Sequence, residues 1–377
     1  MNVRVASVGI GRFGKRSEGL VELAAEAAEA ALQGIGRKTV DLLVVGTMLA
    51  HGPNGPLPLL PRLAGRLGLE SANGLRVEAA SATGAAAFHA AVTALEAGRS
   101  ERALVVAAEK MTDLSTPLLT RELTSALHES EAASGATMPG LGALVAQRYL
   151  GRYGLGPSAV SGVSVHDRSM AARNPAAHFR EPVTAAEVDA SRPVALPLRL
   201  LHCAPISDGA AAVVVEKGRG PATVLGLGQG FDALRVIDRD DLTSFGATRR
   251  AARAAYEAAH LTRKSVDVVE LHDAFAPFAL VHLEDLGFCG PGEGAACYEQ
   301  GWVAPDGRLP VNPGGGLLGR GHPVGTSGLA GIGEIARQLL GEAGPTAISR
   351  RPTVGLAHAM AGLGVQNFVT LLGGSGA

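Results

Sequence analysis

Residues 37–44 read Arg-Lys-Thr-Val-Asp-Leu-Leu-Val, and residues 263–270 read Arg-Lys-Ser-Val-Asp-Val-Val-Glu, at an offset of 226 positions. Each stretch follows an Ala-rich segment, so each unit is typical of an amphipathic helix, a short polar turn and a buried strand. A strand-like segment precedes both helices, at Val3–Gly9 and Ala222–Gly228. A repeat this long indicates two copies of one α/β fold rather than a solenoid.

The repeat predicts two domains, 1–218 and 219–377. Strands alternate with helices in both halves, which favours mostly parallel sheets covered by helices. The first half also contains an excursion, about 111–199, which has no counterpart of equal length in the second half. Long excursions of this kind often cover functional sites.

Several other elements follow from periodicity and from start and stop signals. The pattern predicts helices over Ser81–Gly98 and Ser327–Leu340, the first ending at Gly98, and strands over Arg102–Ala108, Val354–Ala357 and Asn367–Leu372.

The composition excludes several classes of protein. Of 377 residues, 46% are hydrophobic and the net charge is −1, which argues against disorder and against nucleic acid as a partner. Three cysteines are too few to form a disulfide framework in a chain of this length, which excludes a disulfide-rich scaffold. The apolar stretches are too short to span a membrane, and the N-terminus lacks a signal-peptide pattern. We therefore expect a cytoplasmic protein that does not bind membranes.

The segment Gly9–Gly14 matches the pattern GxGxxG after a strand. A dinucleotide site needs the helix to begin at these glycines, whereas here it begins past Ser17. The second half has glycines at the same place, at positions 226, 228 and 230. We interpret both sets as structural turns rather than as a cofactor site.

Four segments interrupt the core pattern with small or polar residues. In the first, Val77–Ala85, a strand ends and a helix begins at Ser81. A side chain at this place lies in the positive field of the helix N-terminus, which favours an anion. Taken alone, however, Ser81 is more typical of a simple helix N-cap.

The other three segments each present a histidine. They are Glu270–Phe275 with His272, Asn312–Gly325 with His322, and Gly355–Gly364 with His358, which we expect to follow a buried strand. A single histidine at a strand end is usually structural. Three of them in one half, at strand ends or in glycine-rich loops, favour a catalytic site.

In order and across nearly the whole chain, these four segments resemble the motifs of the thiolase superfamily. The His-Asp pair at 272–273 and the histidine at 358 resemble the sterol-carrier-protein-type and archaeal-type thiolases. The resemblance implies an α/β fold with two duplicated halves in a five-layered αβαβα core. It also implies a homodimer or higher oligomer that acts on acyl-CoA, has no tightly bound cofactor and no metal, and uses coenzyme A as substrate or product.

The resemblance also implies roles for individual residues. Position 81 is that of the nucleophile that takes the acyl group, and His322 activates it. His272 holds a water or a donor in one oxyanion hole, and the backbone N–H groups of residue 81 and Gly364, next to Gly362, form the other. His358 is a general acid/base.

Residue 81 departs from the family pattern, because it is Ser where these enzymes carry a reactive Cys. A hydroxyl is a far weaker nucleophile than a thiol near neutral pH, which puts ordinary thiolysis in doubt. Cys203, Cys289 and Cys297 stand elsewhere in the motif order. The leading hypothesis is a thiolase-like acyltransferase that carries out Claisen-type cleavage or condensation.

Three explanations are compatible with Ser81. It is a laboratory change from Cys to Ser, or the chain is a retro-aldolase acting on a β-hydroxyacyl-CoA, or it is a non-catalytic acyl-CoA-binding subunit. The aldolase reading implies a small partner protein of the OB-fold or zinc-ribbon type, and it makes Tyr298 a candidate acid/base. Packing of Tyr298 on Trp302 is the more common role for such an aromatic residue.

Overall fold

The computed structural model describes residues 1–49, 51–52, 55–218 and 221–374. In the first half, the strands are β1 (Val3–Ile10), β2 (Leu42–Gly46), β3 (His51–Gly52), β4 (Gly55–Pro56), β5 (Asn73–Val77), β6 (Arg102–Glu109) and β9 (Gly209–Lys217). The helices packed on this half are α1 (Leu20–Ala31), α2 (Leu59–Leu67) and α3 (Thr83–Glu96).

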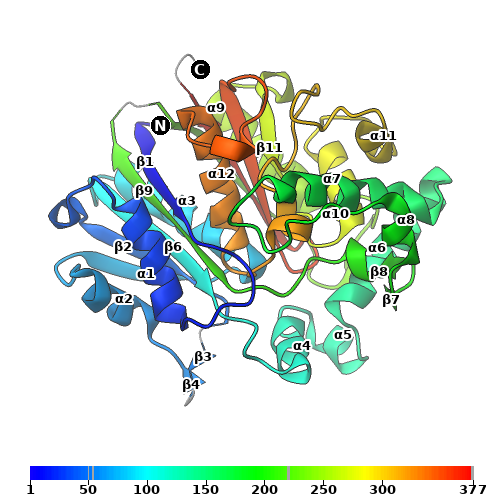
Figure 1. Cartoon of the computed structure of the whole chain (residues 1–377), viewed down its shortest axis with the longest axis horizontal. Helices are drawn as coiled ribbons and strands as arrows, with labels where there is room; N and C mark the ends of the chain where they lie inside the picture. Colours follow the sequence, from blue (N-terminus) through cyan, green and yellow to red (C-terminus); the bar gives the residue numbers. More distant parts are fainter. Residues whose placement is uncertain (50, 53–54, 219–220, 375–377) are drawn as a thin grey trace.

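The excursion between β6 and β9 is largely helical. It contains α4 (Thr116–Thr124), α5 (Glu129–Ala133), α6 (Met138–Tyr153), α7 (Ser161–Ala172), α8 (Ala185–Ala190), and the small strands β7 (Pro193–Ala195) and β8 (Leu198–Arg199). In Figure 1 it runs from the lower edge of the molecule around its right side.

The second half repeats the order of the first. Its strands are β10 (Thr223–Phe231), β11 (Val268–Glu270), β12 (Val354–Ala361) and β13 (Gln366–Gly373). Its helices are α9 (Gly246–Ala259), α10 (Ala276–Asp285), α11 (Gly294–Glu299) and α12 (Ser327–Leu340), and a π-helical turn spans Gly316–Arg320. The helix predicted over Ser327–Leu340 is confirmed.

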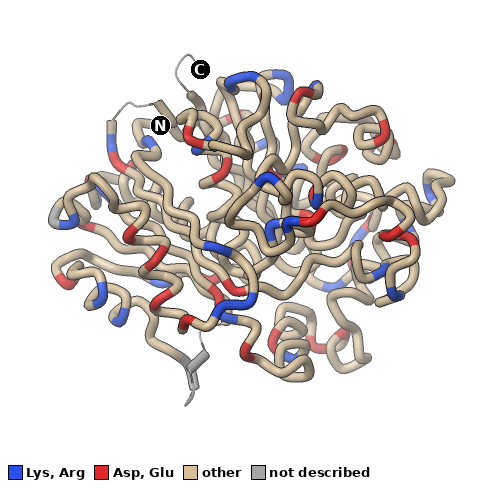
Figure 2. The backbone as a smooth tube through the Cα atoms, in the orientation of Figure 1, with Lys and Arg blue, Asp and Glu red and all other residues tan. Residues whose placement is uncertain are grey.

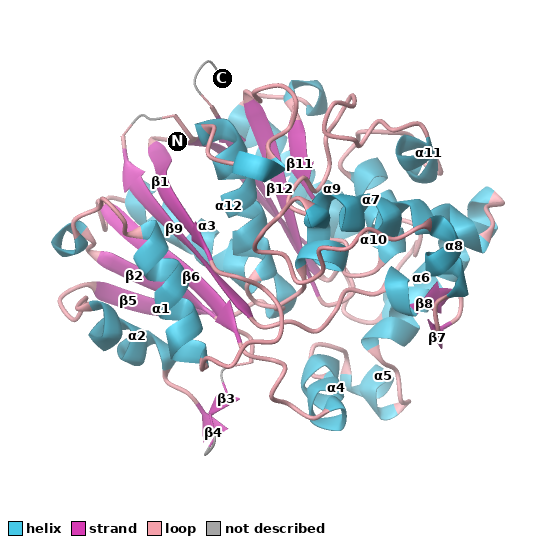
Figure 3. Cartoon of the chain, in the orientation of Figure 1, coloured by secondary structure: helices cyan, strands magenta, loops and turns pink. Residues whose placement is uncertain are grey.

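The named strands of the large sheet lie in the order β11-β12-β13-β10-β1-β9-β6-β2-β5. The two half-sheets meet at β1 and β10, which share one antiparallel pair, Arg4 and Thr223. Figure 3 shows the two halves with helices between them and on their outer faces.

Buried residues divide the molecule into layers. One core cluster joins α1 and α2 to the outer face of the first half-sheet. A second joins α3 and α12 to both half-sheets, and a third joins α9 and α10 to the outer face of the second half-sheet. This arrangement confirms the expected five-layered αβαβα core.

The sheets are less parallel than the sequence indicates. Within each half the strands run in one direction, except that the last strand, β9 or β13, is inserted antiparallel to its two neighbours. For β13 the reason is local, because a short turn rather than a crossover helix joins it to β12. For β9, the excursion brings the chain back to the end of the sheet at which β6 finishes, so β9 runs in the direction opposite to β6.

Four of the glycines interpreted as structural turns lie in strands instead, which corrects the interpretation for these four, whereas Gly11 and Gly14 follow β1. Gly9 is in β1, and Gly228 is in β10. A Cβ atom on Gly228 would lie 1.9 Å from the backbone oxygen of Ala251, and one on Gly9 would lie 2.0 Å from that of Ala27. These glycines therefore let α1 and α9 approach their strands closely.

Basic and acidic residues are interspersed along the described chain (Figure 2). This distribution agrees with a net charge of −1. None of the described helices is long and apolar enough to cross a membrane.

Candidate active site

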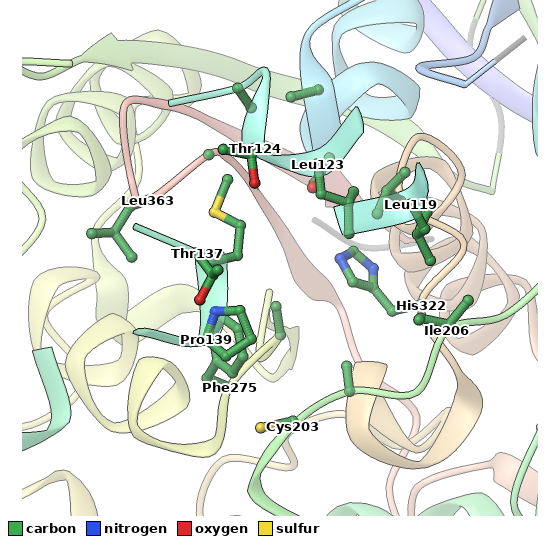
Figure 4. Close-up of a pocket in the computed structure, with 18 of the residues that line it drawn as sticks. Leu119, Leu123, Thr124, Thr137, Pro139, Cys203, Ile206, Phe275, His322 and Leu363 are labelled. Carbon is green, nitrogen blue, oxygen red and sulfur yellow. The ribbon is translucent and has the colours of Figure 1, made fainter. Parts of the chain in front are cut away.

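A cavity of about 240 Å³ lies where the two halves and the excursion meet. Ser81, His272, His322 and Gly362 line it, although they are far apart in the sequence. Figure 4 shows the imidazole of His322 in this cavity, close to side chains of α4. Four of the residues singled out in the sequence therefore come together in one place.

Ser81 lies on a tight turn between β5 and α3. The preceding residue, Ala80, has φ 45°, a left-handed conformation that costs energy for a residue other than glycine. Thr83 holds this turn, since its Oγ1 accepts from Ala79 N at 2.8 Å and donates to Ala80 O at 2.6 Å. Because α3 begins at Thr83, Ser81 is close to the positive end of that helix.

His272 follows β11 and is only 2% exposed. Its ring meets that of His322 edge to face, with centroids 5.2 Å apart. Burial lowers the pKa of His272 well below its usual value, and the nearby His322 and His358 lower it further. The ring is therefore neutral at physiological pH and can donate a hydrogen bond through one N–H.

The loop that carries His322 is held by buried carboxylates. Asp273 accepts from Leu317 N at 2.8 Å, and Glu270 accepts from Gly314 N at 3.0 Å. Glu270 also pairs with the guanidinium of Arg320 at 3.1 Å, with both side chains at most 2% exposed. Removing either partner would leave an uncompensated buried charge, so the pair fixes the loop.

The glycines in this loop have a steric reason. Gly316 has φ 55°, and a Cβ atom there would lie 2.6 Å from side-chain atoms of Asp167, Asp273 and Asn312. A larger residue would displace the carboxylate that anchors the π-helical turn. The backbone therefore passes directly over the acidic group that precedes α10.

His322 is fixed by a serine at the start of α12. Its Nδ1 lies 2.8 Å from Ser327 Oγ, and Ser327 Oγ donates to Pro323 O at 3.1 Å. Since the serine proton is used in that bond, Nδ1–H of His322 donates to Oγ, and Nε2 keeps its lone pair. Burial lowers the pKa of His322 to about 3, so the neutral form with a free Nε2 prevails.

His358 lies inside β12 rather than after it, opposite Val369 of β13, which corrects the predicted strand end. It is 5% exposed, and its ring centroid is 4.2 Å from that of His282 in α10. It does not line the cavity, although Met360, two residues further on the same face, does. Burial lowers the pKa of His358 to about 3.

Gly364 and Tyr298 also lie outside the lining of the cavity. Gly364 has φ 74° and packs against the ring of Phe245. Tyr298 is buried and meets His166 edge to face at 5.6 Å, in a core cluster against which Trp302 also packs. Burial raises its pKa well above its usual value. Neither residue therefore shares with Ser81 the lining of this cavity.

Sequence reasoning missed several parts of the site: Cys203, which stands elsewhere in the motif order, lines the cavity, and two further parts bear on the chemistry. One is Ser327, whose signal was its place five residues after His322 at a helix start. The other is one face of α4, at Thr116, Leu119, Thr120, Leu123 and Thr124, whose helical spacing was visible in the sequence. Among the described residues, no three His, Cys, Asp or Glu side chains are placed to hold a metal ion.

The chain is similar in sequence and fold to known proteins. A family model for "Thiolase, N-terminal domain" matches residues 3–195, and one for "Thiolase C-terminal domain-like" matches residues 228–374. An acetyl-CoA acetyltransferase of Methanothermobacter thermautotrophicus is 37% identical over 354 residues, which cover 91% of each chain.

One further relative is a lyase by name, and one similar solved structure is an aldolase by name. A 17-hydroxy-3-oxo-4-pregnene-20-carboxyl-CoA lyase of Mycobacterium tuberculosis is 35% identical over 245 residues, 61% of each chain. The solved Ltp2-ChsH2(DUF35) aldolase superposes with a TM-score of 0.85 and 26% identity, covering 100% of this chain and 98% of that one. With family models matching both halves, the chain belongs to the thiolase superfamily of acyltransferases.

Proposed function

We propose that this chain makes or breaks a carbon–carbon bond next to the thioester carbonyl of an acyl-CoA. The observation that carries the proposal is the convergence of Ser81, His272 and His322 on one cavity. A base with a free nitrogen and a neutral donor, close to a helix start, are the groups that form and stabilise the enolate of an acyl-CoA.

Each group has a distinct task. Nε2 of His322 takes a proton from the substrate or from Ser81. His272 donates a hydrogen bond to the thioester oxygen, where negative charge develops as the enolate forms. The N-terminus of α3 favours the same charge. Gly362, at the edge of the cavity, is the better candidate for a backbone donor than Gly364, which packs against Phe245.

A retro-aldol reaction is the second candidate, and Ser81 favours it, because it needs no thiolate. Nε2 of His322 removes the proton of the 3-hydroxyl group, the C2–C3 bond breaks, and an aldehyde or ketone leaves. The bonding electrons pass to the enolate oxygen held by His272, and C2 is then protonated to give the shortened acyl-CoA. The similarity to a named lyase and to a named aldolase supports this candidate.

A pair of assays separates the candidates. Thiolysis of acetoacetyl-CoA and aldehyde release from a 3-hydroxyacyl-CoA are measured on the protein as it stands, on Ser81→Cys and on Ser81→Ala. Strong thiolysis gained by Ser81→Cys identifies Ser81 as a disabled nucleophile. Aldehyde release that survives Ser81→Ala identifies a non-covalent retro-aldolase.

His322→Ala is the matched loss-of-function variant in both assays. Loss of a general base lowers the rate about 10²–10⁴-fold. If no variant turns over either substrate and no acyl-CoA binds, the enzymatic proposal is wrong and a structural subunit remains.

We further propose a homodimer or larger cytoplasmic assembly, with or without a small OB-fold or zinc-ribbon partner. The ChsH2(DUF35) component named in the solved aldolase supports a partner. Light scattering of the purified chain measures the first part, and co-purification with its neighbours in the source cell measures the second. A monomer at micromolar concentration contradicts the dimer.

A further inference from the structure

The cavity wall facing the catalytic groups is apolar. Leu119 and Leu123 of α4, Phe275 and Phe278 near the start of α10, and Met360 of β12 contribute to it. None of the described residues that line the cavity is Lys, Arg, Asp or Glu. A wall of this kind accepts hydrocarbon and penalises a buried carboxylate by several kcal/mol.

One face of α4, which includes Leu119 and Leu123, forms the side of the cavity that we call the roof. Leu119 is 2% exposed and packs in a small core cluster with Met111 and Val324. Val324 is two residues from His322, so the roof is anchored to the loop that presents the base. Leu123, one turn further along α4, is only partly buried and reaches the same cavity, as Figure 4 shows.

The volume of the cavity limits what fits beneath this roof. At about 30 Å³ for each water-sized group, about 240 Å³ holds roughly eight carbon-sized groups. A single ring or a medium chain fills this space.

We infer that Leu119 and Leu123 of α4 set the size limit of the acyl group, and that the substrate class is acyl-CoA with a compact, uncharged acyl group of about six to eight carbons. The inference rests on the proposed function, because it takes the cavity to be the acyl site. It adds the class of acyl group and the residues that select it.

Calorimetric titration with butanoyl-, octanoyl- and dodecanoyl-CoA tests the inference without any chemical step. Burial of each methylene group tightens binding about fourfold, so affinity rises from butanoyl to octanoyl and falls at least tenfold at dodecanoyl. Adipoyl-CoA binds at least tenfold more weakly than hexanoyl-CoA, because its terminal carboxylate loses water without gaining a partner.

In Leu123→Ala, we expect the chain length that binds most tightly to move toward dodecanoyl-CoA. In Leu123→Phe, we expect weaker binding of octanoyl-CoA and unchanged binding of butanoyl-CoA. Leu123 is suitable because it is only partly buried, so both variants are expected to fold. The matched control is Leu144→Ala, at an exposed leucine of α6 that does not line the cavity, which leaves the series unchanged.

Two results overturn the inference and are distinguishable. The inference about α4 is wrong, while the proposed function stands, if acyl-CoA binds with an affinity that does not depend on chain length. The same holds if the Leu123→Ala variant folds but shows the same dependence on chain length as the wild type. Absence of binding by every acyl-CoA overturns it together with the proposed function.

Discussion

The ring of His322 and the hydroxyl of Ser327 form one hydrogen-bonded unit, with Nδ1 and Oγ 2.8 Å apart. The serine proton is directed to Pro323 O, so the histidine is the donor in this pair. His322 comes from a glycine-rich loop and Ser327 from the start of α12. The unit therefore couples the orientation of the proposed base to the central helix layer.

Ser327→Ala removes the group that fixes the tautomer of His322. Loss of one hydrogen bond of about 0.5–1.5 kcal/mol lowers kcat roughly 3- to 10-fold, with a smaller change in KM. Steady-state kinetics on the better substrate of the two assays measures the effect. Ser327→Thr keeps the hydroxyl and restores most of the rate, and equal losses in both variants would contradict the role of the hydroxyl.

We expect kcat not to show the fall on the acidic side that protonation of a catalytic histidine usually causes. An unperturbed histidine has a pKa of about 6.5, and a base of that kind loses activity below it. Burial lowers the pKa of His322 to about 3, so its lone pair remains available in mildly acidic solution. We expect kcat at saturating substrate to vary less than about twofold between roughly pH 5 and pH 8.

Circular dichroism at each pH provides the control, because a buried histidine with a lowered pKa also affects folding. The unfolded chain binds this proton below about pH 6.5, whereas the folded chain binds it only near 3. Stability is therefore lost as the pH falls through that window. A roughly fivefold drop in kcat between about pH 6.5 and pH 5.5, with the fold intact, would disprove a depressed pKa.

Of the four positions that the motifs predicted to be catalytic, the cavity contains three, together with Gly362. Each of these motifs lies at the end of a strand or in a glycine-rich loop. They could not place His358. Strand β12 is buried on both faces, so its sequence lacks the polar alternation that marks direction. Only the register shows that Leu356, His358 and Met360 share the outer face.

The duplicated fold was also visible in the sequence, because the repeat preserves a helix, a turn and a strand in each half. The inserted antiparallel strands were not, because pairing between β6 and β9 joins segments separated by the whole excursion. The role of the strand glycines was not visible in the sequence either, because both a tight turn and a close contact with a helix require glycine.

Glu109 should make stability fall as the pH rises. Its carboxylate accepts from Leu49 N at 3.1 Å, but burial raises its pKa from 4.5 to about 7. Between these values the folded chain binds the proton and the unfolded chain does not, so the stabilisation present below about 4.5 is lost on passing through 7. At 1.36 kcal/mol per pKa unit, the change is up to about 3 kcal/mol.

Urea unfolding of the wild type and of Glu109→Gln at both ends of this range measures the effect. The amide keeps an acceptor for the backbone but does not titrate, so the variant loses that part of the pH dependence. The exposed Glu299→Gln is the control and leaves the dependence unchanged. Identical profiles for Glu109→Gln and the wild type would rule out a raised pKa.

Gly228→Ala should be among the most damaging single-methyl additions in the chain. The new Cβ atom would lie 1.9 Å from Ala251 O, a backbone atom of α9 that cannot move without its helix. We expect the free energy of unfolding to fall by about 4 kcal/mol or more, or the variant to fail to fold.

Gly65→Ala is the matched control, because Gly65 lies in α2 with nothing within 4 Å of its added Cβ. There the higher helix propensity of Ala adds about 0.5–1 kcal/mol. Urea unfolding followed by circular dichroism compares the two, and a cost below about 1 kcal/mol for Gly228→Ala would show that α9 does not need this close approach.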